Sequence, residues 1–450
     1  MPPVVYSLIA IGLVASVIYW IIPIRIRTVY LSLLSIFVYI IWSRDLSTVF
    51  FLLLESALGF CVCYFMKKQK NSKICLIIGI ITIILVLAFF KYRKCVFCSD
   101  SLLLRIAVPL GISYYSFKIL SYMIDVYKDP QKSVSWWNYL TYVSFFPQII
   151  CGPISRYDEI NDYLDAKIGK QDIKEGLYTI IKGLFYKAVI ADRLSEYTST
   201  VFGSYSNYNY LALCMAVFFF SIELYCDFAG YSYIVIGICR LMGIRITDNF
   251  RNPYFAVSIK DFWSRWHISL TRWLKDYIYI PLGGNKKGKA RRVINILIVF
   301  AVSGLWHGDS PVYLLWGLWH GVWNVLSFKK VNNRVLNILC TLYTYIIVSL
   351  GWIAFKIDNV KEVVSYIVRM FKVQKVTFDL LAETVMPFSN DYSSAAKMIV
   401  AIILIGILWG LEYTEFRKIN ENKAFRTVLY VSCIVLFGMI GSNSFIYANY

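Results

Sequence analysis

Apolar stretches about as long as a lipid bilayer is thick recur from one end of this 450-residue chain to the other. A helix that crosses a membrane needs roughly 20 mostly apolar residues, because its backbone polar groups must be satisfied internally. The chain is 58% hydrophobic and 16% charged, whereas soluble domains carry about a quarter charged residues. These features predict an all-α, polytopic membrane helical bundle and exclude an ordinary soluble domain.

Twelve stretches are candidate membrane spans. They are Val4–Ile24, Thr28–Trp42, Leu46–Met66, Ile74–Phe90, Leu102–Met123, Tyr139–Ile154, Leu211–Met242, Val293–Trp306, Val312–Phe328, Val335–Phe355, Ala396–Leu411 and Val428–Ile440. The second, sixth and eighth of these are short, so each could be tilted, re-entrant or covered by protein. We therefore expect about eleven transmembrane helices, together with re-entrant and interfacial helices.

The net charge of +19 comes from 46 Lys and Arg against 27 Asp and Glu, and the excess lies mainly in short loops. Such loops stay in the cytoplasm, so the charge indicates membrane topology and not a nucleic-acid partner. We expect Lys67–Lys73, Lys286–Arg292 and Lys329–Arg334 to face the cytoplasm and its anionic lipids. The expected location is the cell (plasma) membrane, with multiple passes. Lys91–Lys94 lies one span after Lys67–Lys73, which leaves the orientation open.

The chain is predicted to be a single integral-membrane domain over residues 1–450, with three parts. Residues 1–100 are plain peripheral spans. In residues 102–327, polar, aromatic, Gly and Pro residues enter apolar sequence. Polar groups at membrane depth are costly unless they face a protein interior or a water-filled cavity, so this part is the predicted catalytic core. Residues 335–450 return to simple C-terminal spans.

The three histidines of the chain, His267, His307 and His320, lie within one 54-residue window. Histidine is the side chain that titrates nearest neutrality, so a buried base or proton shuttle often uses it. His307 follows the predicted span Val293–Trp306, where burial would keep its ring neutral and able to accept a proton. We expect His307 to be a general base and His267 to support it. His320 shares the string GLWHG with His307, but a histidine beside tryptophan is more often a packing residue.

Asp261–Tyr277 has the residue pattern of one amphipathic helix, with aromatic residues on one face and charged residues elsewhere. Trp and Tyr favour the membrane boundary, so an interfacial helix is predicted, with His267 beside its aromatic stripe. The spacing also predicts two ion pairs, Asp261 with Arg265 and Arg272 with Asp276.

Glu223 and Asp227 are four residues apart and therefore share one face of a predicted membrane helix. Intramembrane acids are functional candidates, but they also hold helices together by pairing with cations. We favour this structural interpretation, with Arg240 or Arg245 as the partner.

Several long strings carry a resemblance to one known family. They are Pro109–Lys128, Phe145–Tyr157, Asp227–Gly237, Asn249–Asn285, Gly304–Gly308, Gly351–Lys356 and the closing Phe445–Tyr450. On these strings the chain resembles the membrane-bound O-acyltransferase (MBOAT) family, most closely its bacterial branch of alginate O-acetyltransferases. The PLGGN string at Pro281–Asn285 favours the polysaccharide-acetylating branch over teichoic-acid D-alanyltransferases, which resemble the chain through Phe262–His267.

This resemblance implies the family's membrane fold and an enzyme, an O-acyltransferase. Such an enzyme moves an acyl group, with acetyl preferred, from a cytoplasmic thioester donor to a hydroxyl of a cell-surface or secreted polysaccharide. The donor would be acetyl-CoA or an acyl carrier acting as co-substrate, so no bound cofactor is expected. Transfer can be direct or pass through an extracytoplasmic acyltransferase partner. The family's essential histidine maps onto His307, its second histidine onto His267, and His320 matches a position less tied to chemistry.

Two other functional classes stay open from the sequence. A transporter or flippase for a glycan or lipid-linked precursor would use histidines as a proton relay, although the chain lacks the internal repeat common in transporters. A non-catalytic scaffold for a glycan synthase would not need the histidines. For the enzyme, we expect no metal site. The predicted catalytic residues are His307 and His267, and the predicted substrate-binding residues are Trp306, Asn252, Arg265 and Asp276.

Overall fold

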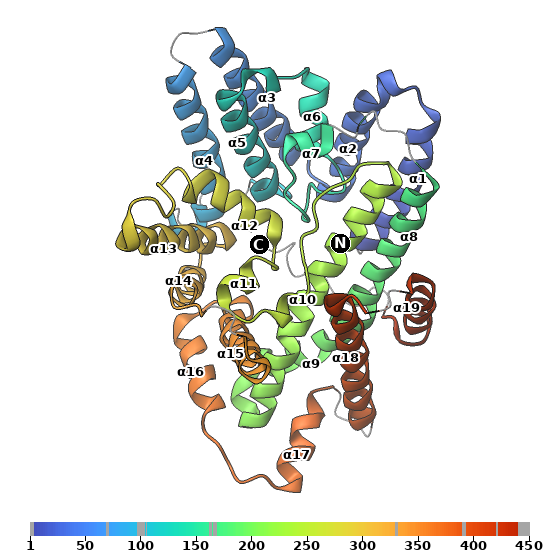
Figure 1. Cartoon of the computed structure of the whole chain (residues 1–450), viewed down its shortest axis with the longest axis vertical. Coiled ribbons are helices and arrows are strands. Elements are labelled where there is room, and N and C mark those ends of the chain that lie inside the picture. Colours follow the sequence, from blue (N-terminus) through green and yellow to red (C-terminus); the bar gives the residue numbers. More distant parts are fainter. Residues whose placement is uncertain are drawn as a thin grey trace. The chain divides into compact units, whose positions relative to one another are not determined.

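The regular elements in this computed structural model are all helices (Figure 1). The structure describes residues 4–68, 72–96, 104, 106–161, 164, 169–328, 332–388, 393–419 and 422–439. The prediction of an all-α chain is therefore confirmed within these ranges. Parts of the predicted loops Lys67–Lys73 and Lys329–Arg334, and the string Phe445–Tyr450, lie outside them.

Eight helices among the described residues are long and apolar enough to cross a membrane by length and composition. They are α1 (Val4–Ile21), η1 with α2 (Ile24–Ser43), α3 (Leu46–Lys68), α4 (Ser72–Val96), α10 (Tyr210–Leu241), α13 (Gly288–His307), α15 with η8 (Arg334–Phe355) and α18 (Ser393–Arg417). Each coincides with a predicted span, so the prediction of a polytopic membrane protein is confirmed.

The other four predicted spans correspond to shorter helices in the described residues. These are α5 (Ile112–Lys128), α6 (Trp136–Ser144), α14 (Pro311–Val325) and α19 (Lys423–Phe437). Further elements are η3 (Pro130–Lys132), α7 (Tyr157–Asn161), α8 (Lys170–Leu184), the π-helix η4 (Phe185–Ala191), α9 (Asp192–Gly203), η5 (Tyr205–Asn207), η6 (Pro253–Phe255), α11 (Ile259–Trp263), α12 (Ile268–Leu274), the π-helix η7 (Lys275–Tyr279), α16 (Val360–Met370), α17 (Phe378–Val385) and η9 (Met386–Phe388).

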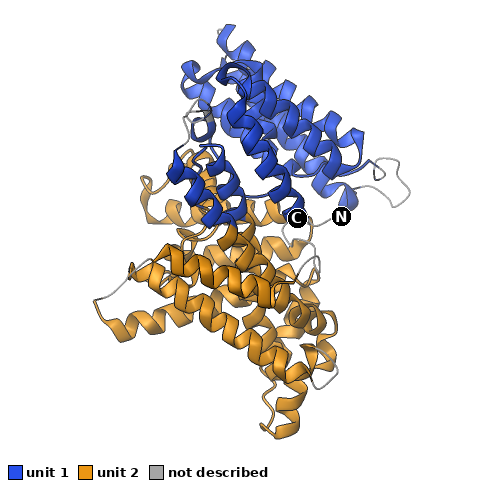
Figure 2. Ribbon diagram, turned by 90° about the vertical axis from the view of Figure 1, so that its right-hand side faces the viewer, with its two compact units in different colours: residues 1–180, 232–248, 447–450 blue, residues 181–231, 249–446 orange. Residues whose placement is uncertain are grey.

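The chain separates into two compact units, shown in blue and orange in Figure 2. The first consists mostly of residues 1–180 and 232–248, and the second mostly of residues 181–231 and 249–446. The predicted catalytic core contributes residues to both. That the chain forms a single domain stays a prediction.

Within the first unit, Asp172 near the start of α8 is buried and forms ion pairs with two arginines. The Arg245 guanidinium lies 3.0 Å from its Oδ1, and Arg240 Nε lies 3.5 Å from the same oxygen. These are the two arginines that the sequence offered as partners for Glu223 or Asp227, so that pairing is wrong.

The buried acids of α10 pair with lysines of the second unit instead. Glu223 lies 3.4 Å from the ammonium of Lys356, and Asp227 lies 2.7 Å from that of Lys187. Lys187 comes from the π-helix η4 and Lys356 directly follows η8, so both cations come from segments distant in sequence from α10. Each of these buried carboxylates is thus paired with a cation, which offsets the cost of burying its charge.

Helices α13 and α14 approach each other at two glycines. A Cβ atom on Gly317 would lie 2.2 Å from the Phe300 carbonyl oxygen, and one on Gly304 would lie 2.3 Å from that of Tyr313. The Cα of Gly304 is only 3.3 Å from the Cβ position of Gly317. These are the first glycines of the two GLWHG strings, so the repeated string serves here as a point of close helix contact.

We predict that Gly317→Ala destabilises the protein by about 1–3 kcal/mol, because the added methyl group forces α13 and α14 apart. The matched control is Gly406→Ala on α18, where a Cβ atom meets nothing within 4 Å. This control should be neutral or slightly stabilising, since alanine favours helices over glycine. The measurement is the thermal unfolding midpoint in detergent. Equal midpoints for both variants would contradict the close contact.

Candidate active site

The three histidines come together in the second unit, around tryptophan rings. The His307 ring lies 4.9 Å, centroid to centroid, from both Trp306 and Trp316. Trp306 is also 6.4 Å from the His267 ring, and Trp316 is 5.1 Å from the His320 ring. Each tryptophan therefore links two histidines. We call these five side chains the histidine–tryptophan cluster.

His307 is the last residue of α13 and is buried. The Phe355 ring lies 5.2 Å from its imidazole, and Gly308 directly after it leaves the helix in an extended conformation. A side chain on Gly308 would clash with the Tyr313 ring, since a Cβ atom would lie 2.4 Å from it. The prediction that the span delivers His307 at its end is confirmed.

The segment predicted as one helix, Asp261–Tyr277, is broken at His267, and that prediction is wrong. His267 adopts a left-handed backbone conformation, with φ 42° and ψ 54°, between α11 and α12. The cause lies outside the segment, because the Ile268 amide donates to the Asn249 carbonyl oxygen at 2.9 Å. A left-handed histidine is uncommon and marks a position held by its surroundings.

The aromatic stripe of this segment faces the interior of the second unit. Trp263, Trp266 and Trp273 are all buried. The Trp266 ring packs 4.8 Å from Trp352 and 5.4 Å from Phe262. The stripe thus belongs to the packed interior of the second unit, where Trp263 lies 5.2 Å from the His320 ring, and not to an outer surface.

Asn249 fixes the protonation pattern of His267. Its Oδ1 accepts hydrogen bonds from the Ser269 amide at 3.3 Å and the Ser269 hydroxyl at 2.8 Å. A backbone amide can only donate, which identifies this Asn249 atom as the oxygen. His267 Nδ1, 3.1 Å from it, therefore carries hydrogen. The Nε2 atom of the neutral ring is then an acceptor, and it has no hydrogen-bond partner among the described residues.

Burial also keeps His267 uncharged. Desolvation lowers the pKa of its imidazole from 6.5 to about 3. The Phe228 ring packs edge-on against it at 4.7 Å and excludes water from that side. At neutral pH the ring is therefore a fixed, neutral hydrogen-bond acceptor.

His320 is enclosed by large rings. Trp263 lies 5.2 Å and Trp352 5.6 Å from its imidazole, and neither ring nitrogen has a hydrogen-bond partner in the described part of the chain. A Cβ atom on Gly351 would lie 2.6 Å from its Nε2, so Gly351 makes room for the ring. These surroundings suit a packing residue, and its role stays a prediction.

The four predicted substrate-binding residues lie at different places in the second unit. They are Trp306, Asn252, Arg265 and Asp276. Trp306 belongs to the histidine–tryptophan cluster. The Asn252 amide donates to the Glu412 carbonyl oxygen at 3.3 Å, and Arg265 forms the predicted ion pair with Asp261 at 2.8 Å. Asp276 lies in η7.

Sequence reasoning missed several residues that shape the site. They are Asn249, Trp316, Trp352 and Phe355. Asn249 begins the resembling string Asn249–Asn285, and Trp352 and Phe355 lie in the resembling string Gly351–Lys356. Placing these residues against a histidine needs the tertiary structure.

Fold and site together define a polytopic membrane protein with a buried histidine at the end of a membrane span and two further buried histidines near it. The chain belongs to the MBOAT, membrane-bound O-acyltransferase family, whose model matches residues 36–334. That range contains the three histidines. The resemblance seen in the sequence is thereby confirmed.

Three relatives with different names illustrate what the chain is similar to. The probable alginate O-acetylase AlgI of Pseudomonas aeruginosa is 33% identical over 312 residues, which are 65% of this chain and 59% of that protein. The peptidoglycan O-acetyltransferase of Helicobacter pylori is 29% identical over 412 residues, 81% of this chain and 73% of the relative. The teichoic acid D-alanyltransferase of Bacillus subtilis is 29% identical over 268 residues, which are 55% of this chain and 68% of that protein. The chain thus spans under two thirds of the alginate relative.

We predict that His267 makes folding stability depend on pH. Because the folded pKa is depressed, its stabilising contribution is full above the ordinary value near 6.5 and falls as pH drops from there toward about 3. Between pH 7.5 and 5, the wild type should lose about 2 kcal/mol more than His267→Gln. The measurement is the free energy of unfolding of both proteins at the two pH values. Equal losses would show that His267 is accessible to protons in the folded state.

Proposed function

We propose that the chain is an O-acyltransferase of the plasma membrane. It moves an acyl group, with acetyl preferred, from a cytoplasmic thioester donor to a hydroxyl of an extracytoplasmic polysaccharide, directly or through a partner protein. Membership of the family and two relatives named as O-acetylating enzymes support this proposal. The observation that carries it is the buried histidine–tryptophan cluster at the end of span α13.

In this mechanism His307 acts as the general base. A nitrogen of its imidazole takes the proton of the acceptor hydroxyl as that oxygen attacks the thioester carbonyl carbon. The carbon–sulfur bond then breaks, and the imidazolium returns the proton to the departing thiolate. General-base catalysis of this kind contributes on the order of 10²–10⁴-fold in rate. The rings of Trp306, Trp316 and Phe355 enclose the imidazole and shield it from bulk water.

His267 plays a different part, because its Nε2 accepts hydrogen bonds. It is suited to hold a hydroxyl of the acceptor or an amide N–H of the donor beside His307. It is not suited to donate to the oxyanion that forms on the carbonyl oxygen. The indole N–H of Trp306 and backbone amides near Gly308 are the candidates for that task.

A D-alanyl group is the second candidate for the acyl group, supported by the relatives named as teichoic acid D-alanyltransferases. The same base and the same thioester chemistry serve both acyl groups. Analysis of the ester released from the cell surface distinguishes acetate from alanine.

The test compares the acyl-ester content of the surface polymer in strains with His307→Ala, His267→Ala or His320→Ala at matched protein levels. We expect His307→Ala to lower the rate of esterification by about 10²–10⁴-fold and His267→Ala to lower it less. His320→Ala should keep esterification if the protein folds. Full esterification in His307→Ala would refute the base. Loss of polymer export with unchanged esterification would favour a transporter.

A further inference from the structure

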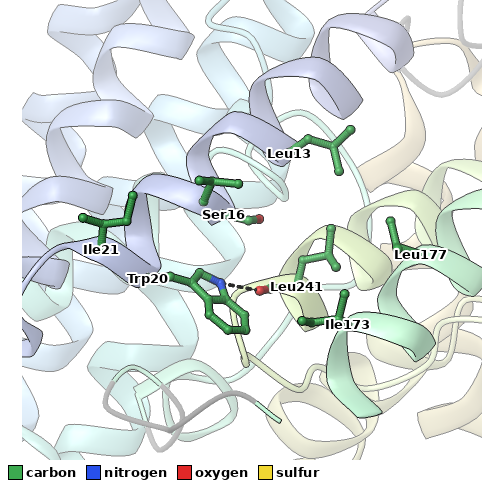
Figure 3. A pocket seen from close by; sticks show the side chains of 8 residues that line it. Leu13, Ser16, Trp20, Ile21, Ile173, Leu177 and Leu241 are labelled. Atoms are coloured by element: carbon green, nitrogen blue, oxygen red, sulfur yellow. Dashed lines mark hydrogen bonds between the residues drawn. The ribbon is translucent and has the colours of Figure 1, made fainter. Parts of the chain in front are cut away.

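An apolar groove of about 400 Å³ lies in the first unit, far in sequence from the histidines. Its walls come from one side of α1, the first turns of α8 and the end of α10 (Figure 3). The lining includes Leu13, Val17, Ile21, Ile173, Leu177 and Leu241. Its volume falls in the range of about 300–1,000 Å³ typical of sites for small ligands. Several of the lining side chains are exposed, so the groove opens to the outside of the unit.

A tryptophan marks one end of the groove. The indole N–H of Trp20 donates to the Leu241 carbonyl oxygen at 2.8 Å, drawn as the dashed line in Figure 3. Tryptophan prefers the boundary between hydrocarbon and head groups. α1 ends one residue later, at Ile21. This end of the groove therefore lies at the level of lipid head groups, and the remainder extends along the membrane span.

Positive charge gathers at the same end. Arg240 precedes the lining residue Leu241, and Asp172 precedes the lining residue Ile173. Asp172 forms ion pairs with both Arg240 and Arg245, whose side chains are 32% and 54% exposed. Two guanidinium groups and one carboxylate leave a net charge of +1 in this group. Guanidinium groups are the preferred partners of phosphate oxygens, which they bind through two parallel hydrogen bonds.

The end of the groove near Arg240 lies on the same side of the membrane as two basic loops. Arg25 follows α1, and the next two spans, α2 and α3, cross away and back again to Lys67 and Lys68. We expect these basic connections to face the cytoplasm, where the leaflet is rich in anionic lipids.

We infer that this groove binds an anionic glycerophospholipid. One acyl chain lies along α1 and α8, and the phosphodiester lies against Arg240 and Arg245. The site is separate from the proposed acyl transfer and does not depend on it.

Matched tryptophan variants test the groove. Val17→Trp places a large ring in the groove. The control Val14→Trp places the same ring on α1 outside the groove. The two positions are matched, because Val17 is 63% and Val14 is 62% exposed. The full-length protein is purified in detergent micelles with palmitoyl-oleoyl phosphatidylglycerol or the matching phosphatidylcholine, and bound lipid is measured by native mass spectrometry. We expect Val17→Trp to weaken phosphatidylglycerol binding by about tenfold or more and Val14→Trp to leave it unchanged. Equal binding by both variants would overturn the proposal.

The arginines are tested separately. Arg240→Gln with Arg245→Gln should bring phosphatidylglycerol binding down to that of phosphatidylcholine, because the charged partner of the phosphate is lost. Inorganic phosphate at equal concentration should not displace the lipid, since most of the site is apolar. A wild type without preference for phosphatidylglycerol, or displacement by inorganic phosphate, would contradict the phospholipid assignment.

Discussion

The close approach of α13 and α14 is the constraint on which the candidate site depends. Because Gly304 and Gly317 carry no side chains, the backbones touch, and Trp316 on α14 reaches the ring of His307 at the end of α13. The same helix carries His320, whose ring lies 5.1 Å from that of Trp316. A side chain at either glycine would clash with the backbone of the facing helix. Helix contacts through small residues are a general device inside membranes, where backbone proximity replaces hydrophobic driving force.

In the second unit, the buried acids and the buried histidines have different surroundings. The acids of α10, Glu223 and Asp227, each meet a lysine, so their charge stays compensated at depth. The histidines meet aromatic rings instead. For His267, burial lowers the pKa of the imidazole, and the contact with Asn249 selects which nitrogen bears hydrogen. A neutral, oriented imidazole of this kind is suited to accept a hydrogen bond from a substrate beside His307.

Local patterns in the sequence predicted the helices and the position of His307 well, because span length and an apolar run are properties of neighbouring residues. The break at His267 could not be predicted in this way. Its cause is Asn249, which is 18 residues earlier and acts through bonds that only the fold brings together. The partners of the buried acids were missed for the same reason, since Lys356 is 133 residues from Glu223. Long-range packing, not propensity, decides both features.

The central claim is that His307 within this cluster is the base for acyl transfer. The most direct measurement is steady-state kinetics of the purified protein in lipid vesicles, with an acyl thioester as donor and His307→Gln beside His320→Gln. The account predicts that His307→Gln lowers kcat by about 10²–10⁴-fold while KM for the thioester stays within about twofold. His320→Gln should change both far less. Wild-type kcat in His307→Gln would contradict the account.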